Sequence, residues 1–405
     1  MRVGVDATSW WNRRGYGRFA RNAVARLVER DPDNTYVLLI DEQSAHAGDL
    51  PAGAEECRVR LSRPASEAAS ADSSRRLADM LRLTSAARRQ GFDVFLFPSV
   101  YTYFPVVGTP VLLGVHDAIA EEHPKLTLPS RRARAFWRAK RALAMRNAAR
   151  IFTVSEASRA VLAERFGLSD VAVVPEAPDP VFRPRDDRDV ERQLGPLGLD
   201  PGSFFVYAGG ISPHKNLATL LDGYGKLRAA RPQAPALVLV GDLESDPYLS
   251  AASSVRRQIA ALGLEEHVLL PGFVSDDALS CLYSAAKAAV LPSLAEGFGL
   301  PAVEAAACGA PTVLSDLPAH RETLGEAGLY FPPTDPAQLA EQLRRLLDEP
   351  SLRERLSARS RQTVATLSWD FAADRLRELL TLIAADTSGR RSHRRRAPDH
   401  AAAGR

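Results

Sequence analysis

Short apolar runs alternate with segments of helical periodicity along both halves of the chain. The runs predicted as strands in the first half are residues 3–5, 36–40, 94–97, 111–115, 151–154 and 171–174. Those predicted in the second half are residues 204–208, 236–240, 268–270, 289–291 and 312–314. A helix is expected over residues 18–30, and one apolar helical face contains Leu339, Leu343, Leu346 and Leu347. This alternation predicts an α/β protein with two doubly wound, Rossmann-like parallel sheets, whose carboxyl edges face a central cleft.

A stretch rich in proline and charge separates the two halves and is typical of a domain linker, which we place at residues 186–202. It divides the chain into an N-terminal domain of residues 1–185 and a C-terminal domain of residues 203–368. Residues 369–386 are expected to form a last helix. The remaining residues 387–405 have few apolar side chains and carry the run RRSHRRR, so a disordered basic tail is expected.

The overall composition is that of an ordinary globular protein. A chain of 405 residues with 45% hydrophobic and 25% charged side chains is long enough for two full cores. A net charge of +3 does not by itself indicate a nucleic-acid partner. The cysteines, which lack C-x-x-C spacing and indicate reduced thiols, are Cys57, Cys281 and Cys308. We find no signal-peptide core and no apolar run near the ~20 residues of a membrane span. We therefore expect a cytoplasmic protein, at most attached to the inner membrane face.

The run EGFGLPAVE places two carboxylates, Glu296 and Glu304, on either side of a glycine-containing loop. Pro301 suits the first turn of a helix, so Glu296 lies at the loop entry and Glu304 one turn inside. The backbone N–H groups at the expected helix start belong to Phe298, Gly299 and Leu300. Such a start is a site for phosphate or another anion. An acidic loop followed by an ordinary helix is the alternative.

Two further loops follow predicted strands and contain paired glycines. In YAGGISPHKN, Gly209 and Gly210 permit a tight turn, and Lys215 could neutralise charge that grows on a leaving group. In RRGYGRF, Gly15 and Gly17 let the backbone approach a ligand closely. A plain turn with a solvated lysine, and a plain strand–helix turn, are the alternatives.

A polar pair, His116 and Asp117, ends another predicted strand in the run VHD. At the carboxyl end of a strand both side chains should point into the cleft, where the imidazole could hydrogen-bond a hydroxyl. A histidine satisfied within the core is the alternative. Ser155, in TVSEASRAVL, is a good N-cap for the helix that follows.

Taken together, these motifs resemble the retaining, nucleotide-sugar-dependent glycosyltransferases of family 4, or glycosyl transferases group 1, which have the GT-B fold. Glu296 and Glu304 match the family's E-x7-E motif. Lys215 matches the lysine of its phosphate loop, usually G-R-L-x-x-x-K-G, but Gly210 stands where the arginine usually lies. His214 could replace part of that charge. The P-x-K-N variant resembles members that transfer mannose from GDP donors.

The resemblance implies that the N-terminal domain binds the acceptor, the C-terminal domain binds the donor, and the last helix crosses back to the N-terminal domain. It places Glu296 on hydroxyls of the donor sugar, Glu304 on the ribose and His116 near the transferred sugar. Lys215 would stabilise the departing diphosphate, together with amides of the Gly15 loop. The backbone segment that would edge the nucleotide base contains Phe273 and Val274. Ser315 and Glu322 match family positions near the cleft.

The implied reaction is transfer of a hexose, with mannose favoured, from a nucleotide-diphosphate sugar, with a GDP-sugar favoured. Configuration is retained, the acceptor is a glycan or lipid-linked, and neither a metal nor another cofactor is expected. Two alternatives stay open. A nucleotide-sugar epimerase shares the architecture, and a non-catalytic partner subunit that binds sugar nucleotides is favoured by Gly210 alone.

Residues 131–150 contain eight Lys or Arg residues and no acid, interleaved with Phe136, Trp137, Leu143 and Met145. A basic amphipathic helix of this kind can lie on an anionic membrane surface, which would suit a lipid-linked acceptor. A solvated basic helix face is the equal alternative. Nucleic acid is not expected, because no nucleic-acid-reading module accompanies the charge.

Overall fold

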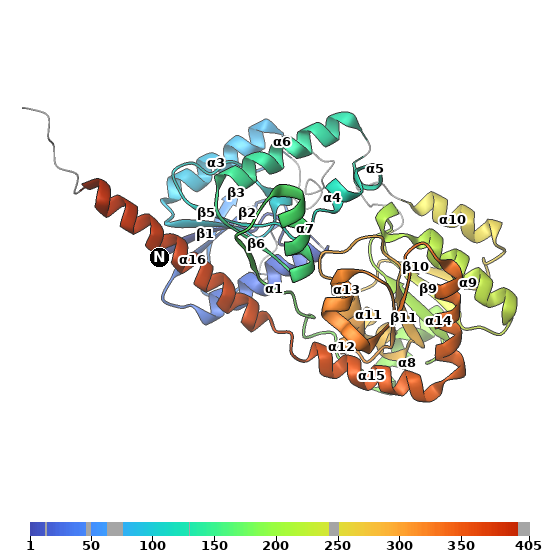
Figure 1. Cartoon of the computed structure of the whole chain (residues 1–405). Helices are drawn as coiled ribbons and strands as arrows, with labels where there is room; N and C mark the ends of the chain where they lie inside the picture. The colour runs from blue at the N-terminus through green and yellow to red at the C-terminus, as the bar shows by residue number, and fades with distance from the viewer. Residues whose placement is uncertain (13, 46–49, 63–75, 129, 243–250, 396–405) are drawn as a thin grey trace, which may run out of the picture.

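Two parallel sheets, each covered by helices, form the framework of the computed structural model, which describes residues 1–12, 14–45, 50–62, 76–128, 130–242 and 251–395 (Figure 1). The first sheet has the order β3-β2-β1-β4-β5-β6-β7 and the second β10-β9-β8-β11-β12-β13. Every strand pair is parallel, so the predicted α/β class with two doubly wound sheets is confirmed.

The first sheet consists of β1 Arg2–Asp6, β2 Thr35–Asp41, β3 Glu55–Val59, β4 Val94–Phe97, β5 Val111–Gly114, β6 Ala148–Thr153 and β7 Val171–Val173. Its helices are α1 Gly15–Arg30, α3 Leu77–Gln90, α4 Ile119–Glu122, α5 Pro124–Thr127, α6 Arg131–Asn147 and α7 Glu156–Phe166. The second sheet consists of β8 Phe204–Ala208, β9 Ala236–Val240, β10 Val268–Gly272, β11 Ala288–Leu291, β12 Thr312–Ser315 and β13 Gly328–Phe331. The remaining helices are α8 Asp187–Leu194, α9 Leu217–Ala230, α10 Ala252–Ala261, α11 Asp276–Ala285, α12 Leu300–Ala307, α13 Pro318–Leu324, α14 Pro336–Asp348, α15 Pro350–Val364 and α16 Trp369–Arg395.

The strands that the sequence did not predict are β3 and β13, and both lie at the edge of a sheet. Three of the five residues of β3 are exposed, and its sequence EECRV has no apolar run. An edge strand pairs on one side only, so it is less fully buried than a central parallel strand. The periodicity that indicates the inner strands is therefore absent from β3.

The segment predicted as a linker contains a helix. Within residues 186–202, α8 begins after Asp186, whose side chain accepts a hydrogen bond from the Asp189 N–H. Val190 and Leu194, one turn apart, are buried in the core of the second sheet. The charges that indicated a linker lie on the outer face of this short amphipathic helix.

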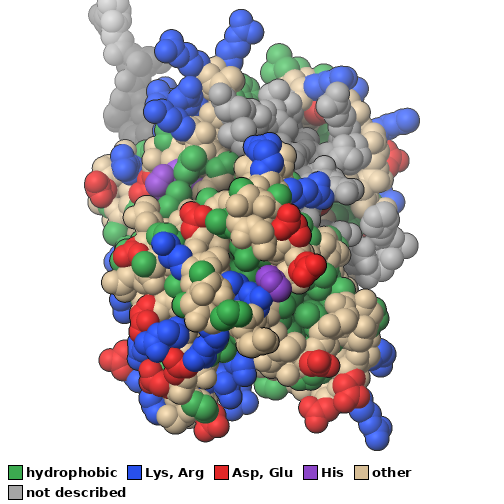
Figure 2. All heavy atoms as spheres, turned by 90° about the vertical axis from the view of Figure 1, so that its right-hand side faces the viewer, with side chains coloured by type: hydrophobic (Ala, Val, Ile, Leu, Met, Phe, Trp, Pro, Cys, Tyr) green, Lys and Arg blue, Asp and Glu red, His purple; other side chains and the backbone are tan. Residues whose placement is uncertain are grey.

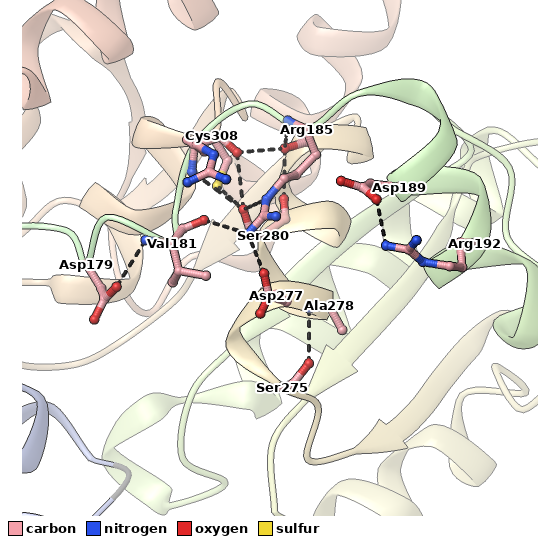
Figure 3. Close-up of polar contacts among 12 residues, drawn as sticks. Asp179, Val181, Arg185, Asp189, Arg192, Ser275, Asp277, Ala278, Ser280 and Cys308 are labelled. Atoms are coloured by element: carbon pink, nitrogen blue, oxygen red, sulfur yellow. Dashed lines mark hydrogen bonds and ion pairs between the residues drawn. The ribbon is translucent and has the colours of Figure 1, made fainter. Parts of the chain in front are cut away.

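The chain between β7 and α8 is fixed to α11 by polar contacts (Figure 3). The Arg185 guanidinium donates to Ser280 Oγ at 3.0 Å and to Asp277 Oδ1 at 2.7 Å. Ser280 Oγ also donates to the Arg183 carbonyl and lies 3.5 Å from Cys308 Sγ. The crossing segment is thus held by the second sheet's helices before α8 begins.

The last helix, α16, returns to the first sheet and packs along α1 (Figure 1). Leu376 and Leu380 are completely buried in a core that also contains Phe19. Arg26 Nε donates to Asp370 Oδ1 at 2.6 Å. This is the crossing helix that the sequence predicts for residues 369–386.

The helix also extends past the point at which the sequence predicts disorder, because residues 387–395 belong to α16. Extending an existing helix needs no new nucleation, and arginine is a good helix former. The rest of the predicted tail, residues 396–405, lies outside the described residues.

Candidate active site between the two sheets

A cavity of about 790 Å³ lies between the two sheets and is lined from both of them. Its walls come from loops that follow β1, β5 and β7 on one side and β8, β10 and β11 on the other. These loops all leave the carboxyl ends of parallel strands, where ligands bind in doubly wound folds. The cavity therefore occupies the position that the strand pattern predicts.

Most of the predicted site residues line this cavity: Gly15, His116, Asp117, Gly209, Gly210, Lys215, Phe273, Val274, Glu296, Gly299, Leu300 and Glu304. Two others have different surroundings. A Cβ at Gly17 would lie 2.1 Å from the Asn12 carbonyl oxygen, so this glycine permits α1 to pack on the loop before it. The Phe298 side chain is buried in the core around α1.

Lys215 and Glu296 form an ion pair inside the cavity, with 2.7 Å between Nζ and Oε1. Lys215 ends the single turn Pro213–Lys215 after β8, and Glu296 follows β11. Burial alone would raise the pKa of Glu296, but Lys215, His320 and a 2.6 Å hydrogen bond from Ser293 lower it to about 2. The Glu296 carboxyl group, 81 positions from Lys215 in the chain, is therefore ionised near neutral pH.

The helix start beside this pair has the geometry that the sequence predicts. Gly299 is the N-cap of α12 with φ of +88°, a conformation that favours glycine, and Pro301 lies in the first turn. The α12 N-terminus, with its free N–H groups, thus faces the cavity beside Lys215.

The loop that carries Glu296 is also held by the first sheet's helices. Ser155 Oγ and Ser158 Oγ donate to the Gly297 carbonyl at 2.5 and 2.9 Å. Ser155 Oγ accepts from the Ser158 N–H as well, so its predicted N-cap role is confirmed. Glu322 accepts from two N–H groups at the start of α7, each at 2.8 Å. The sequence predicts the cap but not these contacts across the cavity's edge.

Arg18 on α1 is a site residue that sequence reasoning missed. Its guanidinium donates to both Glu304 and Asp276, which belong to the opposite half of the molecule. Burial raises the pKa of Glu304 to about 7, although the Arg18 charge opposes that rise. A lone arginine on a helix carries no motif, so only the tertiary contact identifies it.

His214 does not replace the charge of the missing arginine. Burial, and then the neighbouring Lys215 charge, lower its pKa to about 3, so the ring is neutral near pH 7. Within the part of the chain that the structure describes, Arg14 and Arg18 also line the cavity, from the first sheet's side.

His116 is fixed by its backbone contact. Its Nε2–H donates to the Pro98 carbonyl at 2.8 Å, so Nδ1 carries the lone pair. Burial lowers the pKa of His116 to about 4. Asp117 accepts from the Ile119 N–H at 3.0 Å, and burial raises its pKa to about 6. The predicted pair therefore presents a neutral imidazole and a carboxyl group to the cavity.

Two family models match the chain over most of its length. Residues 13–181 match the model described as Glycosyltransferase Family 4, and residues 191–363 match Glycosyl transferases group 1. The chain belongs to glycosyltransferase family 4. Its two sheets and the cavity between them are the GT-B architecture of that family.

The curated proteins to which this chain is similar include two mannosyltransferases. O-antigen chain mannosyltransferase B of Escherichia coli is 31% identical over 223 residues, which are 54% of this chain and 57% of that protein. MMP alpha-(1->4)-mannosyltransferase of Mycolicibacterium hassiacum is 34% identical over 230 residues, which are 55% and 51% of the two chains. The chain thus spans about half the length of the curated relatives it matches.

The fold also matches that of a solved glycosyltransferase. Sucrose-phosphate synthase from Thermosynechococcus elongatus superposes with a TM-score of 0.75 at 19% identity, over 95% of this chain and 100% of that chain. At this identity the likeness shows the shared GT-B fold.

Proposed function

We propose that this protein transfers a hexose, with mannose favoured, from a nucleotide-diphosphate sugar to a glycan or lipid-linked acceptor. The observation that carries the proposal is the partly buried Lys215–Glu296 pair beside the N-terminus of α12, in a cavity that both sheets line. Such a site offers a cation and free N–H groups to a diphosphate, and a carboxylate to sugar hydroxyls.

The donor diphosphate would lie between the sheets, against Lys215 and the backbone amides of residues 298–300. Charge that grows on the departing phosphate is then stabilised by groups already in place. Glu296, whose carboxylate is ionised, would accept hydrogen bonds from hydroxyls of the transferred sugar. Glu304 would bind the ribose, provided that it shares or gives up its contact with Arg18.

The proposed transfer retains configuration and uses no metal. The acceptor hydroxyl attacks from the leaving-group face, and a donor phosphate oxygen takes its proton. This scheme needs no side-chain nucleophile. Contacts between the sheets, such as those of Ser155 and Ser158, would keep water out of the closed site.

A GDP-sugar is the favoured donor for two reasons. Both curated relatives described above are named mannosyltransferases. The lysine of the loop after β8 lies in the run Pro213-His214-Lys215-Asn216, the variant that resembles enzymes using GDP donors.

One specific observation favours a second candidate, a non-catalytic partner that binds sugar nucleotides. Gly210 lines the cavity at the position where the family usually has an arginine. The intact Lys215–Glu296 pair opposes this candidate, since a subunit without turnover has no need to keep a partly buried charge pair.

Thermal stabilisation of the purified protein by a panel of nucleotides and sugar nucleotides tests the donor. A ligand that binds only the folded state stabilises it and raises its melting temperature. At a ligand concentration of 100 times the Kd, the free energy of unfolding rises by about 2.7 kcal/mol. We expect selective shifts with GDP and GDP-mannose, followed by acceptor-dependent release of GDP.

Three other outcomes would revise the proposal. A shift with UDP compounds alone would replace the donor. Turnover of the sugar nucleotide to an isomer without an acceptor would favour an epimerase. A shift without turnover across a broad acceptor panel would favour the non-catalytic partner.

We further propose that α6 contacts an anionic membrane surface. In the space-filling view, several Lys and Arg side chains project from the top of the molecule, and others lie among Asp and Glu side chains in its lower part (Figure 2). The exposed residues of α6 include Arg131, Arg132, Phe136, Arg138, Leu143 and Arg146. Trp137 does not belong to this exposed surface, although the sequence suggested it. Its ring is buried against Tyr101, and its indole N–H donates to Glu121.

Within the described part of the chain, no helix has the length and apolar character to cross a membrane.

Sedimentation with lipid vesicles tests this contact. We expect binding to vesicles with anionic lipid and loss of binding in the variant Arg131→Glu/Arg132→Glu/Arg138→Glu, because attraction near such a surface is worth about 1 kcal/mol per basic residue. Vesicles of neutral lipid are the control. Unchanged binding of the variant would contradict the assignment to α6.

A further inference from the structure

Glu176 is a buried carboxyl group in the cavity wall that the proposed function does not use. It follows β7, the last strand of the first sheet, and only 5% of the residue is exposed. It lines the same cavity as Lys215 and Glu296. No motif marks it in the sequence, because it lies in a proline-rich stretch.

Among the described residues, none makes a hydrogen bond with the Glu176 carboxyl group. His116 lies close to it, with 3.9 Å between Nδ1 and Oε1. That distance is too long for a hydrogen bond. Since His116 donates through Nε2 to Pro98, its Nδ1 lone pair is also open on this side. Buried polar groups normally have partners, so an open donor or acceptor aimed into a cavity indicates a ligand.

The charges around Glu176 favour its neutral form. Burial, and then the carboxylates of Glu304, Glu296 and Asp117, raise the pKa of Glu176 to about 8, while Arg18 opposes the rise. His116, which faces it from the end of β5, is neutral near pH 7. A neutral carboxyl group can donate one hydrogen bond and accept others.

The separation of the two open atoms fits one hydroxyl group. A hydroxyl oxygen at about 2.8 Å from each atom would have the two partners at roughly a right angle, which suits an oxygen that accepts one hydrogen bond and donates another. We infer that Glu176 is a substrate-binding residue whose carboxyl O–H donates to one sugar hydroxyl of the bound substrates, while the same hydroxyl donates to His116 Nδ1. This inference rests on the proposed function, because it concerns the sugar bound in that site.

Steady-state kinetics of the full chain over a range of pH test the inference. Removal of the group in Glu176→Ala should lower kcat/KM at pH 7 about tenfold, the loss expected for one buried hydrogen bond. Glu176→Gln should restore most of that loss, because its amide can donate and accept. Wild-type kcat/KM should fall relative to that of Glu176→Gln as the pH rises above about 8, where the wild-type carboxyl group ionises.

Deoxy analogues identify the hydroxyl and its source. For the wild type, kcat/KM should be lower with an analogue of the donor or the acceptor that lacks this hydroxyl than with the complete substrate. For Glu176→Ala, kcat/KM should be the same with the analogue and with the complete substrate. The inference is overturned if Glu176→Ala stays within twofold of the wild type at pH 7. It is also overturned if Glu176→Gln has the wild-type pH profile. The same holds if every deoxy analogue lowers kcat/KM by the same factor in Glu176→Ala as in the wild type.

A measurement without substrate separates this inference from the proposed function. The folded state keeps Glu176 protonated up to about pH 8, whereas an unfolded glutamate ionises near pH 4.3. The folded state therefore binds more protons in this window, and stability falls as the pH rises from about 5 to 8. The melting temperature of Glu176→Gln should fall less over this window than those of the wild type and the control Glu164→Gln, whose site on α7 is exposed. If the melting temperatures of all three proteins fell equally, Glu176 would not be buried in its neutral form, and the inference would fail. If the wild type transferred sugar from no donor, the proposed function would fail instead.

Discussion

Replacing Lys215 by alanine is expected to lower sugar transfer by a factor on the order of 10² to 10³, with the fold retained. The lysine supplies the side-chain cation nearest Glu296, 2.7 Å away, and its charge would offset that of the departing diphosphate. Removing one preorganised charge or donor from such a site has an effect of this size. The fold should persist because Glu296 keeps its hydrogen bond from Ser293 and can take up a proton. Turnover with the donor found by thermal stabilisation, together with circular dichroism, measures both parts.

The matched control for Lys215→Ala is Lys226→Ala, which removes an exposed lysine from α9, the helix that follows the same loop. It should transfer sugar at the wild-type rate. Glu296→Ala should be as inactive as Lys215→Ala, since it removes the other half of the pair. Near-normal turnover of both Lys215→Ala and Glu296→Ala would refute the assignment of this pair to the site.

Replacing Leu376 by alanine is expected to destabilise the protein by about 2–5 kcal/mol, the usual cost of a leucine-sized cavity in a core. Leu376, on α16, is fully buried in the core that α16 forms with the first sheet's helix α1. For domains of this size each kcal/mol lowers the melting temperature by roughly 2–4 °C. Thermal and urea unfolding of the purified variant measure the loss.

Leu382→Ala provides the comparison on the same helix, because Leu382 is 42% exposed. Its effect should be within about 0.5 kcal/mol, as for other surface positions. If both variants melted like the wild type, α16 would not contribute to the stability of the first sheet.

The inner strands and the site loops could be predicted because parallel strands leave a continuous apolar run, and because glycine and proline mark the loops at their carboxyl ends. The boundaries of β4, β8 and β9 agree with the prediction residue for residue. The edge strand β3 and helix α8 were missed because most of their surface is polar. Arg18 and Glu176 were missed for a different reason. Each matters through contacts with residues far away in the sequence, and a single sequence does not show such contacts.

The packing of α16 on α1 has a consequence for the order in which the protein is completed. Arg26 and Asp370, which join the two helices, are 344 residues apart in the chain. A ribosome that adds about 5–20 residues per second needs roughly 20 to 70 s to cover that distance. During this interval the apolar face of α1 has no cover, and uncovered apolar surface of this kind invites association with other nascent chains. The sheet that is synthesised first is therefore the last to complete its core. The helix that completes this core, α16, is synthesised only after the second half of the chain.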